Sequence, residues 1–594
     1  MAEEKQEKKK AGIIWRILKW IGLAIPTILL ILAILFFPSW KVTILFFIIL
    51  AACVIPKKMR KWFWLSVAAI VIALIIWIFL PDDDEGWRPY TFEKELAAIE
   101  AQYTVPDEEN AAKIYDELFG TMNGDPNEPK FFLRSRPSSK DEPWLSKDHP
   151  ETAEWLKGYE STIEKLLQSA KKDKCHFHIP AYSWDLDQDM ERLPKMRRCT
   201  FLLLSAANND IAEGRIDAGL EKYLCIIRMA KYLYQQPVII DFLVGFAIEG
   251  LALSQLNRFV IEGQPNGEQL ELIGNTIKGL KNNWSSDWPK ILDLEKLHSK
   301  NTLCSSTYQV NPQGKVRLSR DPCAGMKEQW QEELKVGKIQ DSEAIATLQR
   351  LLYPTYLQRK RCKAKTILSW FFMPSTPQKA AKIIDGSYER YYAMTGPNFN
   401  WQKEPKEYPI TSLFSFTFLY NYRRKIERIA DISGPVYYKI HEIYVRNLSL
   451  RRGSRLLTAI KQYNIEHGSW PENLEQVKGS VPAEVLVDPI TGDAFVYKLI
   501  EEDFMLYSRG KNGIDEGGIR REVVDPNAAR EPVDPNFFKE ILELESEFFG
   551  ETSDPNVLKQ MYDPNDYRPT KTVGDDVLIW PPRSRKTKDQ ETDV

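Results

Sequence analysis

The stretch YSRGKNGIDEGG, residues 507–518, combines residue types that can bind a cation with a glycine-rich turn. Asn512, Asp515 and Glu516 carry amide and carboxylate oxygens, which are the ligands that hard metal ions prefer. Asn-Gly and Gly-Gly pairs are equally typical of turns that need no ligand. Two hypotheses are therefore open: the loop binds a metal, or it turns the chain and leaves its acids in solvent.

A second group of possible ligands lies in CHFHIP, where Cys175, His176 and His178 stand close together. Alternation along an extended segment would place the two histidines on one side. Such a pair would supply half of a metal site, but a structural zinc site needs four ligands and no clear second pair follows. The pattern favours ordinary structure, with a metal as the alternative.

Recognisable catalytic motifs are missing from the sequence. It contains neither a GxxxxGK[ST] phosphate loop nor a GxSxG nucleophile turn, and HEIYV at His441 lacks the second histidine of HExxH. No pair of carboxylates stands out for acid–base work. The 80 basic and 82 acidic residues give a net charge of -2, which does not favour nucleic acid as a partner. We predict a protein without catalytic activity.

The elements that must position the loop are a helix and a hairpin. A helix is predicted from about residue 454, ending at Gly468 as a C-cap before Pro471. Alternation predicts a strand at DAFVYKL and a second strand at FMLYS, joined by a polar connection. We expect an antiparallel hairpin that packs its aromatic side chains against the helix.

Three ordered segments in this region resemble the globular domain of the major pseudopilin of type II secretion. The matching residues are, in the first segment, Tyr463, Gly468, Trp470 and Pro471; in the second, Asp488, Pro489, Gly492, Phe495 and Tyr497; in the third, Tyr507, Ser508, Gly510, Asn512, Gly513, Asp515, Glu516, Gly517 and Gly518. The resemblance implies a small α+β module at residues 451–525. It covers about one eighth of the chain, and the arrangement resembles large membrane-anchored bacterial proteins that carry this module at their C-terminal end.

The resemblance also implies a ligand for the loop, because the last loop of this family can hold calcium. Calcium takes 6–8 oxygen ligands, and Asn512, Asp515 and Glu516 are the candidates here. The family has a further acid pair after the double glycine, whereas this chain has Arg520 and Arg521 close behind it. The loop is therefore first a marker of the fold and only second a calcium site.

The N-terminal part of the chain predicts a membrane anchor. Apolar runs at 21–37, 42–55 and 62–80 predict three spanning helices within residues 1–81. The second run is short and spans only if Trp40 and Lys41 lie at the interface; if it does not cross, the large soluble part would be cytoplasmic. Basic residues precede the first run and lie between the second and third, and four acids follow the third, so the N-terminus should be cytoplasmic and the remainder extracytoplasmic. A cleaved signal peptide is the alternative for the first run, but no small-residue cleavage site follows it. The predicted location is the bacterial inner membrane, with the lipid bilayer and envelope or secretion proteins as partners.

Residues 82–450 predict a mainly α-helical extracytoplasmic domain. Helical periodicity dominates, with one helix ending near Gly214 and the next beginning near Asp217. The apolar run 238–256 contains Asp241 and Glu249, which predicts a buried core helix rather than a membrane span. Cys304 and Cys323 are the first candidates for a disulfide. An envelope enzyme with an unrecognised site in this domain is the alternative to a structural or interaction protein.

The tail at residues 526–594 predicts short helices followed by a disordered end. Asp-Pro-Asn at Asp534 and Asp554 is a typical helix start, with Asp as N-cap and Pro in the first turn. The final stretch WPPRSRKTKDQETDV is polar and is expected to be disordered.

Overall fold

A computed structural model describes most of the chain between residues 86 and 518 together with a short C-terminal segment. The described residues are 86–121, 142–179, 192–280, 282–318, 374–396, 399, 434–501, 503–518, 521–524, 570–573, 575–581 and the isolated residues 65, 68, 69 and 72. Nearly all of the three predicted spans lies outside them. Among the described residues one helix, α11, is long and apolar enough to cross a membrane. The multi-span anchor therefore stays a prediction.

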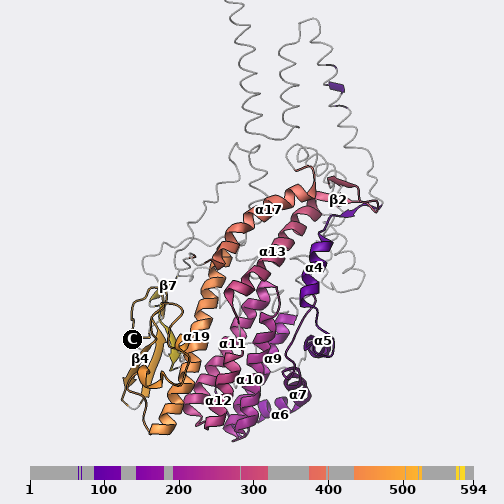
Figure 1. Cartoon of the computed structure of the whole chain (residues 1–594). Helices are drawn as coiled ribbons and strands as arrows, with labels where there is room; N and C mark the ends of the chain where they lie inside the picture. The colour runs from indigo at the N-terminus through magenta and orange to yellow at the C-terminus, as the bar shows by residue number, and fades with distance from the viewer. Residues whose placement is uncertain are drawn as a thin grey trace, which may run out of the picture.

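The described part of the chain is mainly helical, with small antiparallel sheets (Figure 1). The helices are α4 (Glu93–Tyr103), α5 (Ala112–Thr121), α6 (Pro150–Gly158), α7 (Glu160–Ser169), α9 (Arg192–Ala212), α10 (Ile216–Tyr234), α11 (Ile239–Glu262), α12 (Gly267–Lys278), α13 (Trp284–Thr307), α17 (Pro377–Tyr392) and α19 (Gly434–His467). The strands are β1 (Arg88–Pro89), β2 (Tyr308–Val310), β3 (Val316–Leu318), β4 (Val496–Ile500), β5 (Asp503–Ser508), β6 (Arg521–Val524), β7 (Thr570–Val573) and β8 (Val577–Trp580). Short 3-10 helices are η2 (Ala393–Thr395), η3 (Leu474–Val477) and η4 (Ala483–Val485).

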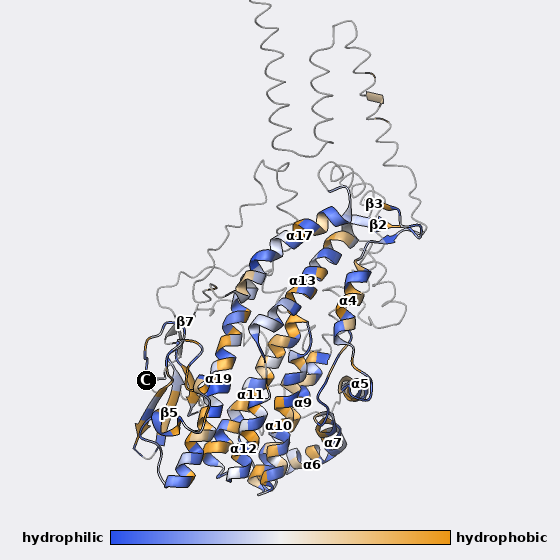
Figure 2. Cartoon of the chain, viewed as in Figure 1, coloured by the Kyte–Doolittle hydropathy of each residue, from blue (hydrophilic) through white to orange (hydrophobic). Residues whose placement is uncertain are grey.

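The helical domain is built around α10 and α11. The predicted break between α9 and α10 is confirmed, and Gly214 in the connection has a φ of 80° that favours glycine. α10 packs against α9 and α11, and α11 packs in turn against α19. The more peripheral α17 is amphipathic, burying Ala380, Ile384 and Tyr388 while its other face is hydrophilic (Figure 2).

The two charged residues of α11 lie inside the protein. Asp241 and Glu249 are both 0% exposed. Asp241 pairs with Arg192 of α9, and Glu249 pairs with Arg451 of α19. A buried carboxylate is stable only when it is paired, so these partners explain how an apolar helix carries two acids in a core. This packing is what the prediction of a buried core helix requires.

The C-terminal module is mounted on α19. This helix begins at Gly434, well before the predicted start near residue 454, and it ends as predicted at Gly468. Gly468 has a φ of 73°, and its N–H donates to the carbonyl of Asn464 at 2.8 Å. The predicted boundary between residues 450 and 451 falls inside α19, so the helical domain and the module share one helix.

The predicted hairpin is confirmed, and a strand from the tail completes its sheet. β4 and β5 pair antiparallel with Val496 opposite Tyr507, and β8 pairs with the other edge of β5. Disorder from Trp580 onward was expected, but Trp580 ends β8 and is buried. A Cβ added to Gly453 of α19 would lie 2.2 Å from Cδ1 of Ile579, so only glycine lets β8 pack this closely on the helix. The predicted tail helices at the Asp-Pro-Asn motifs lie outside the described residues.

The two larger of the four hydrophobic clusters among the described residues hold most of these elements together. The larger core joins α9, α10 and α11 to the module, because Leu456 of α19, Phe504 of β5 and Trp580 of β8 belong to the same cluster as the helical domain. The second core is rich in aromatic residues and lies between α11, α13, α17 and the first half of α19, including Trp288 and Tyr437. The module is therefore packed onto the helical domain rather than tethered to it.

Candidate functional site

Asp515 of the predicted calcium loop is held by the hairpin. Its carboxylate accepts hydrogen bonds from Tyr507 Oη at 2.6 Å, from Lys498 Nζ at 2.9 Å and from the N–H of Gly517 at 3.0 Å. The hydrogen bonds from Tyr507 and Lys498 lower the pKa of Asp515 to about 2. The charge of Asp515 is thus balanced by the protein, although its side chain is 41% exposed.

Asn512 and Glu516 contact each other. Their side-chain oxygens do not point with those of Asp515 toward one common position where a cation could bind. Nδ2 of Asn512 donates to Oε1 of Glu516 at 3.0 Å, and Oδ1 of Asn512 accepts from the N–H of Ile514 at 2.8 Å. Oε2 of Glu516 accepts from the N–H of Asp575. The side-chain oxygens that would bind a cation are therefore occupied by donors of the protein.

Two acids from the tail anchor the loop. Oδ2 of Asp576, a fully buried residue, accepts from the N–H groups of Glu516 at 3.0 Å and Gly518 at 2.7 Å. Oδ2 of Asp575 accepts from the N–H of Lys511 at 2.5 Å. A Cβ on Gly510, which has a φ of 67°, would lie 2.0 Å from the carbonyl oxygen of Asp575. The loop and the tail fit together only because position 510 is glycine.

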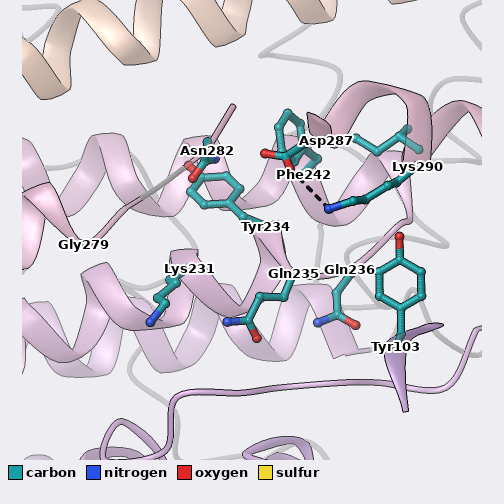
Figure 3. A pocket seen from close by; sticks show the side chains of 11 residues that line it. Tyr103, Lys231, Tyr234, Gln235, Gln236, Phe242, Gly279, Asn282, Asp287 and Lys290 are labelled. Carbon is teal, nitrogen blue, oxygen red and sulfur yellow. Dashed lines mark ion pairs between the residues drawn. The ribbon is translucent and has the colours of Figure 1, made fainter. Parts of the chain in front are cut away.

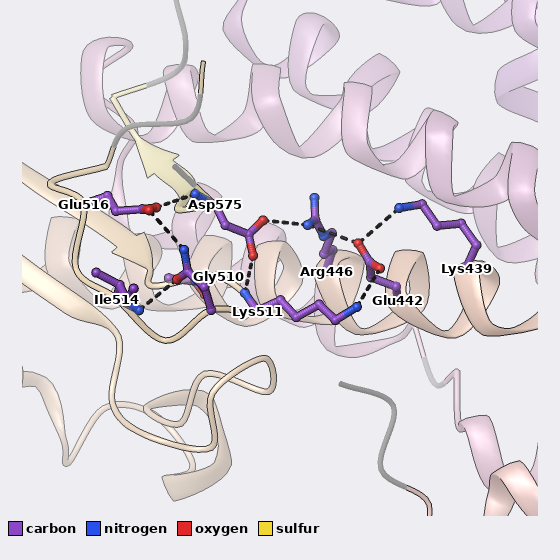
Figure 4. Close-up of polar contacts among 10 residues, drawn as sticks. Lys439, Glu442, Arg446, Gly510, Lys511, Ile514, Glu516 and Asp575 are labelled. Atoms are coloured by element: carbon purple, nitrogen blue, oxygen red, sulfur yellow. Dashed lines mark hydrogen bonds and ion pairs between the residues drawn. The ribbon is translucent and has the colours of Figure 1, made fainter. Parts of the chain in front are cut away.

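A row of alternating charges continues from the loop onto α19 (Figure 4). Asp575 Oδ1 accepts from Arg446 at 2.8 Å, and Arg446 also pairs with Glu442 at 3.1 Å. Glu442 in turn lies 3.6 Å from Nζ of Lys511 and 3.3 Å from Nζ of Lys439. These contacts fasten the loop to the helix that connects it with the helical domain.

The side-chain oxygens of the loop are not arranged to coordinate a calcium ion. Within the described residues no group of three His, Cys, Asp or Glu side chains could hold a metal. Asp515 would have to leave Lys498 and Tyr507 before its oxygens could face a cation. Calcium binding by Asn512, Asp515 and Glu516 is the expectation from the resemblance; the side-chain contacts instead favour the alternative, a turn stabilised by its own acids.

The residues of CHFHIP have separate roles. His176 Nε2 lies 3.0 Å from Oε1 of Glu100, and its ring stacks on Tyr103. His178 is exposed, whereas Cys175 is buried, and its N–H donates to the side chain of Gln235. The backbone of this segment is hydrogen-bonded to the side chains of Gln235 and Gln236, which directly follow α10.

The described cysteines are buried thiols. Cys175, Cys199, Cys225 and Cys304 are thiols that form no disulfide within the described residues, and burial raises the pKa of Cys304 to about 12. The structure therefore does not form the predicted bridge from Cys304, and Cys323 lies outside the described residues.

A cavity of about 570 Å³ lies between α4, α10, α11 and α13 (Figure 3). Its lining residues are Tyr103, Lys231, Tyr234, Gln235, Gln236, Phe242, Gly279, Asn282, Asp287, Lys290 and Ile291. The volume falls in the range of small-molecule sites. Sequence reasoning missed this site, because its residues come from separate helices and form no local motif.

Several polar side chains of the cavity already have partners. Gln235 and Gln236 bind the backbone of residues 173–177, and Tyr234 Oη donates to Oε2 of Glu249 at 2.5 Å. Asp287 accepts from the N–H of Asn283 at 2.9 Å. These residues form the walls of the cavity and fix its shape.

Glu249 links the cavity to α19. Nε and Nη2 of Arg451 bind the two oxygens of Glu249 at 2.7 and 2.6 Å, and Nη1 donates to the carbonyl of Leu280 at 3.0 Å. A bidentate pair of this kind fixes both position and angle. Through Tyr234 and Leu280, one arginine of α19 holds two sides of the cavity.

Comparison with known proteins did not add a relative: no protein-family model, no curated protein and no solved structure matches the chain.

Proposed function

We propose that the protein is a membrane-anchored, extracytoplasmic structural or interaction protein of the bacterial cell envelope, related to type II secretion. The proposal rests on the pseudopilin-like segments between residues 463 and 518 and on the apolar, basically flanked runs before residue 81. Multi-pass insertion in the inner membrane with a cytoplasmic N-terminus belongs to the same proposal.

The observation that best supports an interaction role is where exposed apolar side chains lie. Eight large hydrophobic residues are exposed among those described, and five of them belong to the module: Ile465, Val487, Leu499, Ile500 and Ile514. A contiguous exposed apolar patch is typical of a contact surface, and the proposal assigns these five residues to one. The shared core and α19 support the module that carries them.

The location is tested by reporter fusions after residue 85. The proposal expects that alkaline phosphatase fused at this position is active in bacterial cells. It also expects that green fluorescent protein fused at the same position does not fluoresce. The opposite pattern would place the large domain in the cytoplasm and contradict the proposal.

The interaction role is tested by site-specific photo-crosslinking in cells. A photoreactive residue at Ile514 (61% exposed) or Leu499 (45%) should form a defined adduct with another envelope protein. The matched control is Leu272 on α12, which is 48% exposed but outside the module, and should form none. Equal adducts at all three positions, or none, would argue against the module as the contact surface.

The rival proposal, an envelope enzyme, would place its reaction in the cavity of the helical domain. The described lining offers two lysines, amides and tyrosines, with Asp287 as its single carboxylate. Two oxygens of Asp287 accept from Asn283 and Ser286. An acid–base pair needs a second titratable group of suitable pKa, so this lining supports binding better than catalysis.

A further inference from the structure

We propose that the cavity between α4, α10, α11 and α13 binds a small organic anion, a molecule with one carboxylate or phosphate group attached to an apolar body. This assignment goes beyond the proposed envelope role and does not depend on it, because it rests only on the side chains that line the cavity.

The donors of the cavity are the first argument. Nδ2 of Asn282 is buried and lacks a hydrogen-bond partner within the described structure. A buried amide without a partner is destabilising, and an acceptor on a ligand would satisfy it. Burial, with the charges of Asp293 and Asp287, raises the pKa of Tyr103 to about 12, so its phenol stays protonated and can donate.

The cations are the second argument. Within the described part of the chain, the ion pair of Lys231 is a long one, 3.6 Å, with the carboxylate of Asp173, which is 95% exposed. Lys290 lies 3.7 Å from Asp287, a distance too long for a strong hydrogen bond. Two lysines and one aspartate in the lining leave an excess of one positive charge. This balance favours a ligand with a single anionic group.

The acceptors point the same way. The side-chain oxygens of Gln235 and Gln236 accept from the N–H groups of Cys175 and Phe177, and the tyrosine oxygen at position 234 contacts Glu249. These three oxygens are thus engaged by the protein. Of the side chains that remain, the two lysines and Nδ2 of Asn282 are donors, and they select a ligand with acceptor atoms.

The apolar part of the lining indicates what carries the anionic group. Phe242 and Ile291 line the cavity beside the ring of Tyr234, which packs against Phe242 at a centroid distance of 5.4 Å. An aromatic or aliphatic body would cover these side chains, while its acid group reaches Asn282 or a lysine. Figure 3 shows the side chains of Asn282, Tyr234, Phe242 and Lys290 in its upper part, those of Lys231, Gln235 and Gln236 below them, and Tyr103 at the lower right.

Isothermal titration calorimetry of the full-length protein in an uncharged detergent tests the proposal, with blank titrations into detergent subtracted. The probes are benzoate, phenyl phosphate and benzylamine, three molecules with a common ring but different charged groups. We expect saturable binding of benzoate or phenyl phosphate, and the stronger of the two identifies the acid group. Benzylamine should not bind.

Three variants locate the binding. Lys231→Met combined with Lys290→Met should weaken binding at least tenfold, and Asn282→Asp should do the same because it replaces the donor by a negative charge of the same shape. The control Lys382→Met removes an exposed lysine on α17 and should bind like the parent protein. Equal thermal midpoints would show that all variants are folded. Absence of binding by both anions, equal binding of benzylamine, or unchanged binding in the cavity variants would overturn the assignment.

Discussion

In the loop at residues 507–518, Asp515 and Glu516 accept hydrogen bonds from lysine, tyrosine, amide and N–H groups of the protein itself. In the cavity of the helical domain, by contrast, the buried amide nitrogen of Asn282 finds no partner among the described residues, and the described carboxylates nearest to Lys231 and Lys290 are 3.6 and 3.7 Å away. The loop has residue types that suggest a site, and the cavity has residues that form one.

The difference shows what polar side chains do once they are placed. A carboxylate whose hydrogen bonds are all made within the chain stabilises the fold, because a ligand would have to replace contacts already present. A donor left unsatisfied in a cavity weakens the fold slightly and favours a ligand. The predictions below use this contrast, since substitutions in the anchoring contacts should change stability and substitutions in the cavity should change binding.

The largest effect is expected from Arg451→Met, which removes the support beneath the cavity. Glu249 would be left as a buried charge without its partner, which costs roughly 3–5 kcal/mol. Urea unfolding followed by tryptophan fluorescence measures this loss. The double variant Glu249→Gln with Arg451→Met should lose clearly less than the sum of the single variants. Strict additivity would show that the pair does not connect α11 with α19.

A smaller loss is expected from Asp576→Ala, which removes the anchor of the loop. The N–H groups of Glu516 and Gly518 would lose their common acceptor, at a cost of about 1–3 kcal/mol. Asp576→Asn keeps an oxygen at that position and should recover part of the loss in the same urea experiment. If alanine at position 576 were harmless, the loop would not be held by the tail.

Asp515→Asn should cost less still, below about 1 kcal/mol, because the carboxylate is partly exposed and its ion pair with Lys498 is screened by solvent. The pKa of Asp515 in the fold is about 2, below the ordinary value of about 3.9. Its contribution is therefore present above pH 4 and lost as the pH falls from about 4 to about 2. Stability curves of the parent and the variant should converge below pH 2. A constant difference at all pH values would contradict this origin.

The smallest effect on stability is expected from Lys231→Met and Lys290→Met, within about 0.5 kcal/mol each, because both side chains have only long ion pairs. Their thermal midpoints should match that of Lys382→Met. A marked loss would mean that the lysines of the cavity are structural, like the acids of the loop.

The local parts of this structure could be predicted from the sequence. Gly468 as a cap, the hairpin around Tyr497 and the break after Gly214 depend on neighbours in the chain, so composition and periodicity were sufficient. The acids of α11 correctly indicated a buried helix. The partner of Glu249 was not predictable, because Arg451 lies 202 residues from Glu249.

The parts that sequence reasoning missed depend on distant segments. β8 pairs with β5, and Asp576 binds the N–H of Glu516, which lies 60 residues earlier in the chain; both come from a tail that is polar overall. The cavity gathers residues from Tyr103 to Ile291, and none of them belongs to a motif. Only packing brings these groups together, so neither the anchor of the loop nor the cavity leaves a signal in local sequence.

The contrast between loop and cavity is tested most directly by titrating one preparation of the full-length protein with two ligands, calcium and then benzoate in the presence of EGTA, while recording the thermal midpoint. We predict no shift with calcium, because Asp515 and Glu516 are engaged by the protein, and a saturable rise with benzoate that Lys231→Met with Lys290→Met abolishes. A rise with calcium that Asp515→Asn abolishes, together with no response to benzoate, would contradict the account.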